Sequence, residues 1–278
     1  MTNNGIKLSV SVVVYNPQLD VLLKEFAALK TAFIYAREKF TVNFLVYIVD
    51  NSNALDYAHP IQELLNTFFS ELNYVEVNYL KSSKNLGYGY GNNLIINQLS
   101  SDYHLVINPD IFVAKDTFVE ALEYLESHPE VGLLLPAVYG EDGQQHYLCK
   151  RNPTLFDMFL RSFAPSFIRK LFADRLKLFE MRDQDYAGEI KNIPYPSGCF
   201  MLFRRDILQK INGFDEQFFM YVEDADIGRR TLKVADSIYL PQVKVIHKWS
   251  RKTHDEWKFR WITIKSVLFY WWKYGGIY

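Results

Sequence analysis

The chain lacks cysteine pairs, long apolar runs and a marked net charge. Its 278 residues include only two cysteines, Cys149 and Cys199, and no C-x-x-C spacing, so neither a zinc ribbon nor a redox pair is indicated. A reduced, cytoplasmic environment is therefore expected. No apolar run approaches the roughly 18 residues that span a bilayer. Residues 1–7 are polar and do not resemble a signal peptide.

The net charge of −1 conceals an uneven distribution. Residues 244–278 contain eight basic and two acidic side chains, whereas residues 1–243 contain 23 basic and 30 acidic ones. A basic tail on an acidic body indicates an anionic partner for the tail. We do not expect nucleic acid as a partner, because it would explain the tail but not the carboxylates that follow predicted strands in the body.

Continuous apolar segments alternate with segments of helical spacing along the chain. Strands are predicted at residues 8–15, 44–49, 74–80, 103–107, 131–138, 200–204 and 243–246, and helices at 19–40, 61–69, 91–99 and 118–127. This order predicts an α/β fold with a mostly parallel central sheet covered by helices on both faces. Residues 146–182 break the pattern and are interpreted as an irregular or helical insertion.

Polar side chains directly follow three of these strands. In open α/β sheets, ligands bind beyond the carboxyl ends of the strands. One such cluster alone indicates only a turn, because Asn, Asp and Pro are common turn residues. Three at one edge favour a ligand site; they are Tyr15-Asn16, Asp50-Asn51 and Asn108-Pro109-Asp110.

An acidic cluster, Glu223-Asp224-Ala225-Asp226, opens a predicted helix after residues 218–221, which are nearly all aromatic. Capping and the helix dipole explain one or two acids there. A carboxylate near apolar walls is disfavoured in its charged form, which makes it a better base. His247 ends a strand-like run; a lone histidine is more often structural than a metal or phosphate ligand.

Eight motifs follow one another in an order that resembles a known family. They are SVVVYNP at 11–17, VDNS at 49–52, NLGYGYGNN at 85–93, INPD at 107–110, HPEVG at 128–132, SGCFMLFRR at 197–205, GFDEQFFMYVEDAD at 213–226 and VIH at 245–247. Together they resemble glycosyltransferase family 2 with the GT-A fold, especially the rhamnosyltransferase-like subgroup of bacterial surface-polysaccharide biosynthesis. The resemblance covers residues 8–270.

The resemblance implies a division of the chain into functional parts. Residues 1–246 would form the GT-A catalytic domain, with a nucleotide-sugar half at 1–115 and an acceptor and catalytic half at 116–246. Residues 247–278 would form a C-terminal helical, aromatic and basic appendage.

The resemblance also implies residue roles on the donor side. The nucleotide would be held by Tyr15, Asn16 and Asp50, beside a loop that includes Asn85 and Gly87. Asn108 and Asp110 stand at the family's D-x-D positions, with Asp110 on a divalent metal, Mg²⁺ or Mn²⁺. The Asn at the first of these positions leaves fewer carboxylates for the metal. His247 would contact the metal or the pyrophosphate, and Arg251 the donor phosphates.

On the acceptor side, the resemblance assigns the catalytic base to Asp224. Glu223 would support that base, and Ser197, Gly198 and Asp226 would lie against the acceptor.

The implied function is inverting transfer of a sugar from a nucleotide-sugar donor to a saccharide acceptor, expected to be linked to a lipid pyrophosphate in O-antigen, lipopolysaccharide or other cell-surface polysaccharide synthesis. The first choice of donor is dTDP-rhamnose, and the alternative is a UDP-hexose of galactose, glucose or N-acetylglucosamine. A non-catalytic nucleotide-sugar-binding protein is disfavoured, because Asp110 and Asp224 are both present. A nucleotidyltransferase is disfavoured as well, because no Gly-rich basic loop follows the first strand.

The tail has an aromatic face at helical spacing, formed by Trp257, Trp261, Ile264, Leu268 and Trp272, with Lys258, Lys265 and Lys273 away from its centre. A basic helix of this kind suits a membrane interface, here the inner face of the cytoplasmic membrane. Residues 155–178 would add to that surface. The alternatives are a helix packed on the protein body with solvated lysines, or a tail buried in a homodimer.

Overall fold

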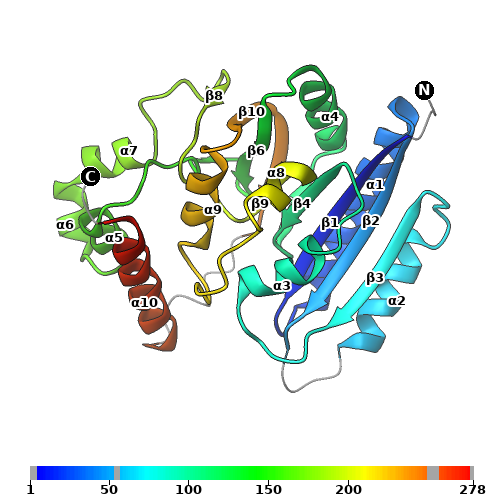
Figure 1. Cartoon of the computed structure of the whole chain (residues 1–278), viewed down its shortest axis with the longest axis horizontal. Helices are drawn as coiled ribbons and strands as arrows, with labels where there is room; N and C mark the ends of the chain where they lie inside the picture. Colours follow the sequence, from blue (N-terminus) through cyan, green and yellow to red (C-terminus); the bar gives the residue numbers. More distant parts are fainter. Residues whose placement is uncertain (1–4, 53–56, 249–256, 276–278) are drawn as a thin grey trace.

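The computed structural model describes residues 5–52, 57–248 and 257–275 (Figure 1). In these residues one sheet of ten strands runs through the chain in the order β3-β2-β1-β4-β9-β6-β10-β5, with β7 beside β6 and β8 beside β10. The strands are β1 (Ile6–Val14), β2 (Val42–Asp50), β3 (Val75–Lys81), β4 (Tyr103–Ile107), β5 (Ile111–Val113), β6 (Val131–Gly140), β7 (Gln145–His146), β8 (Ile190–Lys191), β9 (Phe200–Arg204) and β10 (Asp236–His247).

The sheet is parallel in its first half and mixed in its second. β1 pairs in parallel with β2 and β4, and β2 pairs in parallel with β3. β9 then lies antiparallel between β4 and β6, while β6 and β10 are again parallel. The predicted α/β fold with helices on both faces is confirmed, and the antiparallel β9 is the feature that the apolar pattern did not reveal.

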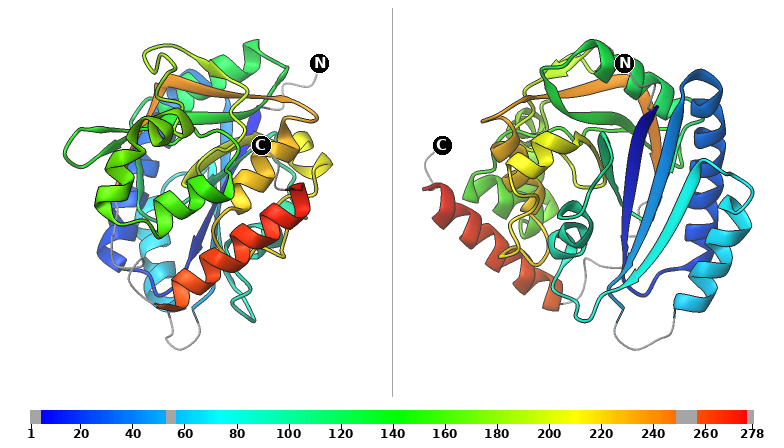
Figure 2. Two further views of the ribbon diagram at one scale, coloured as in Figure 1. Left: turned by 90° about the vertical axis from the view of Figure 1, so that its left-hand side faces the viewer. Right: turned by 45° about the vertical axis from the view of Figure 1, so that its right-hand side comes forward.

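Helices cover both faces of the sheet (Figure 2). One face packs against α1 (Leu19–Lys39), α2 (Ala58–Phe69) and α4 (Thr117–Ser127). The other packs against α3 (Tyr88–Ile96), α8 (Arg205–Lys210) and α9 (Glu223–Thr231). Both faces of the central strands are therefore buried, which is why these strands are apolar throughout rather than alternating.

A third hydrophobic cluster fixes the predicted insertion and the C-terminal helix to the body. The insertion forms three short helices, α5 (Leu155–Ser162), α6 (Ser166–Leu171) and α7 (Ala173–Phe179), and the tail forms α10 (Trp257–Tyr274). Figure 2 shows α10 beside these helices, and α5 contacts it directly. The buried side chains of this cluster are Met158, Phe179, Tyr195, Phe218, Val222, Ala225 and Tyr270.

Several element boundaries differ from the prediction, and two of the differences have a clear physical reason. α3 begins at Tyr88 rather than residue 91, directly after Gly87 with its φ of 109°. β10 is twelve residues long, whereas only residues 243–246 were predicted, because Pro241 lies at a register irregularity within it. The predicted boundary between donor and acceptor halves at residue 115 stays a functional prediction, since one sheet runs through both.

None of the helices in the described part of the chain combines the length and apolarity needed to cross a bilayer.

Candidate active site

The turn after β4 and the end of β10 meet at one corner of the sheet. Antiparallel pairing of β5 with β10 sets Ile111 opposite His247. This register places His247 Nε2 3.4 Å from Asp110 Oδ2, with exposed side-chain fractions of 11% and 24%. The backbone N–H of Lys248 also donates to the Asp110 carbonyl. The structure therefore brings together the two residues that the sequence assigned to a metal.

This corner offers few protein ligands for a divalent ion. Among the residues that the structure describes, no group of three or more His, Cys, Asp or Glu side chains is arranged to hold a metal. Mg²⁺ commonly takes one or two carboxylates and completes its shell with waters and substrate phosphates. Asp110 and His247 fit an ion shared with a bound diphosphate, rather than a closed protein site. Arg251, the predicted donor-phosphate contact, lies outside the described residues.

Glu25 of α1 is an unexpected acid close to this corner. It is fully buried, and within the described part of the chain neither carboxylate oxygen has a hydrogen-bond partner. Burial raises the pKa of Glu25 well above its usual range, and the Asp110 charge raises it further. The raised pKa favours the protonated, neutral form of Glu25, which places no second negative charge beside Asp110. Sequence reasoning missed it because a glutamate in a long helix reads as a surface residue.

Asp50 is an internal anchor at the end of β2. Its buried carboxylate accepts hydrogen bonds from the Ser52 N–H, the Tyr79 hydroxyl and the Lys81 ammonium at 2.7–2.8 Å. Burial alone would raise the pKa of Asp50, but the hydrogen bonds from Lys81, Ser52 and Tyr79 lower it overall. Asp50 thus ties together the carboxyl ends of β2 and β3, and its contact with a nucleotide stays a prediction.

Tyr15 and Asn16, by contrast, are open to solvent beside Asp50. The Tyr15 side chain is 51% exposed, as suits a surface for a nucleotide base. Asn16 is also exposed, and it takes a left-handed φ of 46° while its N–H donates to Ser52 Oγ. The β1 and β2 polar clusters are therefore joined by a hydrogen bond.

Gly87 brings the donor-side loop against the acceptor-side segment. A Cβ at this position would lie 2.0 Å from the Phe219 carbonyl oxygen, so only glycine permits the approach. Asn85 Oδ1 accepts the Gly87 N–H, and the Tyr88 N–H donates to the Phe219 carbonyl. The predicted loop residues therefore shape the backbone between the two halves.

The acidic cluster opens α9 in a strained setting. Tyr221 and Val222 both have a φ of 70°, an unusual conformation for a non-glycine residue and especially for a β-branched one. Gly228 of α9 permits close contact with residues 194–196, because a Cβ there would lie 2.2 Å from Pro196 Cδ. These constraints bring Asp224 within hydrogen-bonding distance of Gly198, whose N–H donates to Asp224 Oδ2 at 3.1 Å.

Residues 198–199 join the donor and acceptor sides of the site. The Gly198 carbonyl accepts the Tyr88 hydroxyl at 2.8 Å. The next carbonyl, that of Cys199, accepts the Asn108 N–H at 2.9 Å. The Asn108–Asp110 turn, the loop before α3 and Asp224 are therefore connected through two consecutive residues. Ser197 and Gly198, predicted on the acceptor side, are half-buried at this junction.

Burial controls the ionisation of the two acids that open α9. It raises the pKa of Asp224, an effect that the Lys150 charge partly offsets. It also raises the pKa of Glu223 well above the usual range, and the neighbouring Asp224 charge adds to this. Glu223 is 7% exposed, and its Oε2 has no hydrogen-bond partner in the described structure. Asp224 is thus the better placed of the two to carry the negative charge.

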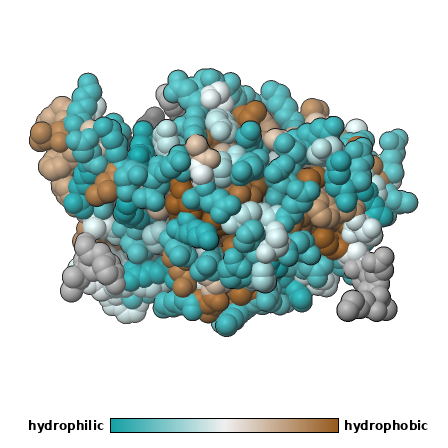
Figure 3. Space-filling view, turned by 90° about the horizontal axis from the view of Figure 1, so that it is seen from above, coloured by the Kyte–Doolittle hydropathy of each residue, from teal (hydrophilic) through white to brown (hydrophobic). Residues whose placement is uncertain are grey.

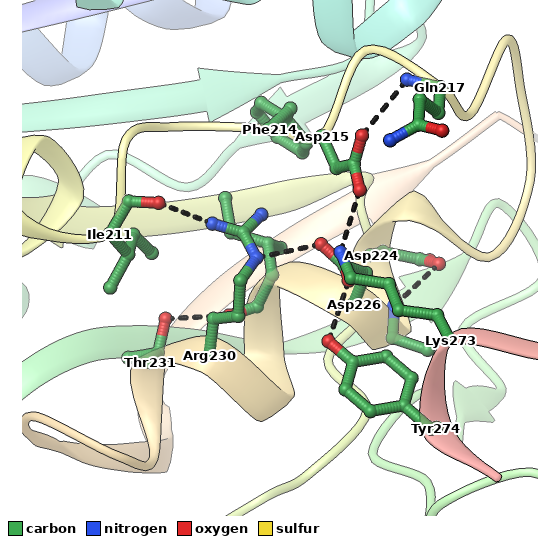
Figure 4. Close-up of polar contacts among 12 residues, drawn as sticks. Ile211, Phe214, Asp215, Gln217, Asp224, Asp226, Arg230, Thr231, Lys273 and Tyr274 are labelled. Atoms are coloured by element: carbon green, nitrogen blue, oxygen red, sulfur yellow. Dashed lines mark hydrogen bonds and ion pairs between the residues drawn. The ribbon is translucent and has the colours of Figure 1, made fainter. Parts of the chain in front are cut away.

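Asp226 has a different environment and faces the C-terminal helix (Figure 4). Its fully buried carboxylate pairs with Lys273 Nζ at 2.6 Å and Arg230 Nε at 2.7 Å, and it accepts the Tyr274 hydroxyl at 2.7 Å. Lys273 also pairs with Asp215 at 2.6 Å. With its oxygens occupied by protein donors, Asp226 joins α9 to α10, and this geometry favours a supporting role over the predicted contact with the acceptor.

Replacing Lys273 with Met tests this connection. The variant leaves Asp226 with Arg230 and the Tyr274 hydroxyl but removes the ion pairs from α10 to Asp226 and Asp215. We therefore expect the free energy of unfolding to fall by about 2 kcal/mol, less than for a fully broken buried pair. Urea denaturation measures the change. The matched control is Lys265→Met on the exposed side of α10, which should stay within about 0.5 kcal/mol of the native protein. Equal effects of the two substitutions would contradict the role given to Lys273.

Comparison with known proteins bears on the family of the chain. The family model described as "Glycosyl transferase family 2" matches residues 9–212. The N-acetylglucosaminyl-diphospho-decaprenol L-rhamnosyltransferase of Mycobacterium tuberculosis (strain ATCC 25618 / H37Rv) is 27% identical over 192 residues, which cover 65% of this chain and 61% of that protein. Rhamnosyltransferase WbbL of Escherichia coli (strain K12) is 28% identical over 170 residues, covering 58% of this chain and 60% of that one. The matches thus span about three fifths of each relative.

Solved structures show the same fold. The mannosyltransferase PcManGT from Pyrobaculum calidifontis, in complex with GDP-Man and Mn²⁺, has a TM-score of 0.61 at 15% identity and covers 93% of this chain and 61% of its own. The likeness concerns the fold alone. Because the family model covers well over half of the sequence, the chain belongs to glycosyltransferase family 2.

Proposed function

We propose that this protein is an inverting glycosyltransferase in which Asp224 is the catalytic base. The observation that carries the proposal is the junction at residues 198–199. It hydrogen-bonds to Asp224 through Gly198 and to the Asn108–Asp110 turn through Cys199. A half-buried carboxylate with a raised pKa is thereby held in the same framework as the corner suited to a diphosphate and its metal ion.

In the proposed reaction, Asp224 takes the proton from an acceptor hydroxyl. The oxygen then attacks the anomeric carbon of the donor sugar as the bond to the nucleoside diphosphate breaks. No second carboxylate is needed as a nucleophile, so a single displacement inverts the anomeric configuration. Asp110 and His247 would hold a divalent ion, which when bound would offset the charge of the departing diphosphate.

We further propose L-rhamnose from dTDP-rhamnose as the donor sugar, giving an α-L-rhamnoside from the β-linked donor. Support comes from the names of the two relatives, which are both rhamnosyltransferases. A UDP-hexose is the alternative donor. The name of the mycobacterial relative includes a diphospho-decaprenol, which supports a lipid-linked saccharide as the acceptor class, as in surface-polysaccharide synthesis.

The substitution Asp224→Asn should remove sugar transfer while leaving donor binding unchanged. We expect a loss of kcat of about 10²–10⁴-fold, the usual contribution of a general base. In the native protein the base works only when deprotonated and its pKa is raised. Activity should therefore disappear on acidification at a pH above the ordinary aspartate value of about 4. Initial rates across pH measure both effects; an acidic limb at or below pH 4 would argue against Asp224.

The donor and the metal are tested together by thermal shift with Mn²⁺ or Mg²⁺ and dTDP-rhamnose, UDP-glucose, UDP-galactose, UDP-N-acetylglucosamine or GDP-mannose. A ligand that binds only the native state raises the Tm. We expect a shift with dTDP-rhamnose that requires the metal and is lost with EDTA or in Asp110→Ala. A Tm shift with only one of the other nucleotide sugars would identify that sugar, rather than rhamnose, as the one transferred. Full retention of the metal-dependent Tm shift in Asp110→Ala would contradict the proposal that Asp110 binds the metal ion.

We also propose that α5, α6 and α10 rest on the inner face of the cytoplasmic membrane. Hydrophobic residues gather at one end of the molecule in Figure 3, the end at which Figure 1 shows α5–α7. Arg169, Lys170 and Arg260 would meet anionic lipid there. The exposed apolar side chains on these helices are Leu155, Phe156, Phe159, Phe167, Leu171, Trp257, Trp261, Leu268, Trp271 and Trp272.

Flotation with anionic vesicles tests this surface. The double variant Phe167→Ser/Leu171→Ser should lose membrane binding by roughly tenfold or more, because each apolar side chain contributes about 1.5–3 kcal/mol when buried. The control is Leu23→Ser on α1, which is 46% exposed and lies outside the proposed surface. Native protein that stays at the bottom of the gradient would rule the membrane contact out.

A further inference from the structure

A buried lysine close to the proposed base has no part in the chemistry described above. Lys150 is only 6% exposed. Its backbone exchanges two hydrogen bonds with Tyr195, at 3.0 and 3.1 Å, and its Nζ lies 4.4 Å from the centre of the Tyr195 ring. Tyr195 comes three residues before Gly198, so this ammonium is tied to the segment that binds Asp224.

A second cation converges on the same tyrosine. Arg161 of α5 lies over the Phe179 ring at 5.5 Å, and Phe179 packs edge-on against Tyr195 with their centroids 6.2 Å apart. The two positive charges interact, because the Arg161 charge adds to burial in lowering the pKa of Lys150 to about 8. Two like charges in a largely buried place lose hydration and repel each other, and a bound anion would offset this free-energy cost.

The protein supplies no such anion by direct contact. Within the described parts of the chain, no carboxylate oxygen lies within 4.0 Å of the Lys150 ammonium or the Arg161 guanidinium. Asp224 is near enough for its charge to raise the pKa of Lys150, yet it is not an ion-pair partner. Two other lysines close to the site are paired: Lys81 with Asp50, and Lys273 with Asp215 and Asp226.

The surroundings of this pair have an apolar side. Arg161 lies on α5, where Phe156 and Phe159 are 40% and 45% exposed. Phe163, directly after this helix, is 38% exposed. The pair therefore lies between the base on one side and an exposed apolar layer on the other. A molecule that carries a phosphate between a sugar and a hydrocarbon chain presents the same sequence of chemical groups.

From this geometry we infer that Lys150 and Arg161 form a phosphate-binding subsite for the acceptor, which holds the diphosphate that links the acceptor sugar to its lipid. The inference rests on the proposed function, in which a sugar passes from the nucleotide to a lipid-linked acceptor. It adds the residues that bind the negatively charged diphosphate of that acceptor. Guanidinium and ammonium groups are the usual side-chain hydrogen-bond donors to phosphate in proteins. Binding here would place the sugar attached to the diphosphate toward Asp224 and the hydrocarbon chain along α5.

Calorimetric titration in EDTA tests the subsite, because removing metal ions weakens any phosphate binding that depends on the Asp110–His247 corner. The probes are farnesyl diphosphate, inorganic pyrophosphate and dihexanoylphosphatidylglycerol. We expect native protein to bind the first two, with farnesyl diphosphate the tighter. Lys150→Met and Arg161→Met should each weaken both by about tenfold, the effect of losing one charged hydrogen bond.

The control is Lys177→Met. Lys177 lies in the same helical layer, but its side chain is 59% exposed and pairs with Asp174. This variant should bind both probes as the native protein does. Replacing the buried Lys150 could destabilise the protein and so weaken binding indirectly. Arg161 is only half-buried, so Arg161→Met tests the same subsite with a smaller effect on stability.

Three results would overturn the inference. The first is equal binding of both diphosphates by all variants. The second is a Lys150-dependent preference for the phosphatidylglycerol probe, which would indicate a general lipid headgroup. The third is a loss of nucleotide binding with Mn²⁺ in Lys150→Met, which would assign the cations to the donor. If the diphosphates bind as expected but no sugar is transferred, the subsite stands and the proposed function fails.

Discussion

The arrangement of the site depends on the hydrogen bonds made by residues 198–199, immediately before β9. Gly198 binds Asp224 through its N–H and Tyr88 through its carbonyl, while the Cys199 carbonyl accepts the Asn108 N–H. Because β9 lies antiparallel between β4 and β6, its first residues reach the edge where the parallel strands end. One short segment thereby sets the position of the proposed base relative to the donor corner.

Around this segment, electrostatics separate acids that look alike in the sequence. Loss of hydration raises the pKa values of the half-buried Asp224 and the buried Glu223. Asp226, one turn of α9 away from Glu223, has its charge balanced by Lys273 and Arg230. The same separation applies to lysines, since Lys273 is paired with carboxylates and Lys150 has no ion-pair partner among the described residues. A charged side chain that has an ion-pair partner in the protein holds two elements together, whereas one without such a partner remains available to a substrate.

Much of the fold could be read from the chain. Continuous apolar strands alternating with amphipathic helices determined the α/β class, because strands buried on both faces cannot alternate. The polar clusters after β1, β2 and β4 were predicted at one edge because parallel strands share their carboxyl ends. The order of the motifs pointed to glycosyltransferase family 2, which the family match shows. Individual donor, metal and acceptor contacts remain predictions.

The tertiary structure alone decided what depends on distant partners. The sequence placed Lys273 with the solvated lysines of an aromatic helix, but Asp215 and Asp226 bind it, because the opposite face of α10 packs on the protein. Nothing in the sequence marks Glu25 or Lys150 as buried, yet both are. Helical spacing predicted one face from Trp257, Trp261, Ile264, Leu268 and Trp272, and all of these side chains except the half-buried Ile264 are exposed. It could not say that this face stays exposed, because burial depends on the neighbours that a helix meets, and those are fixed only when the whole chain folds.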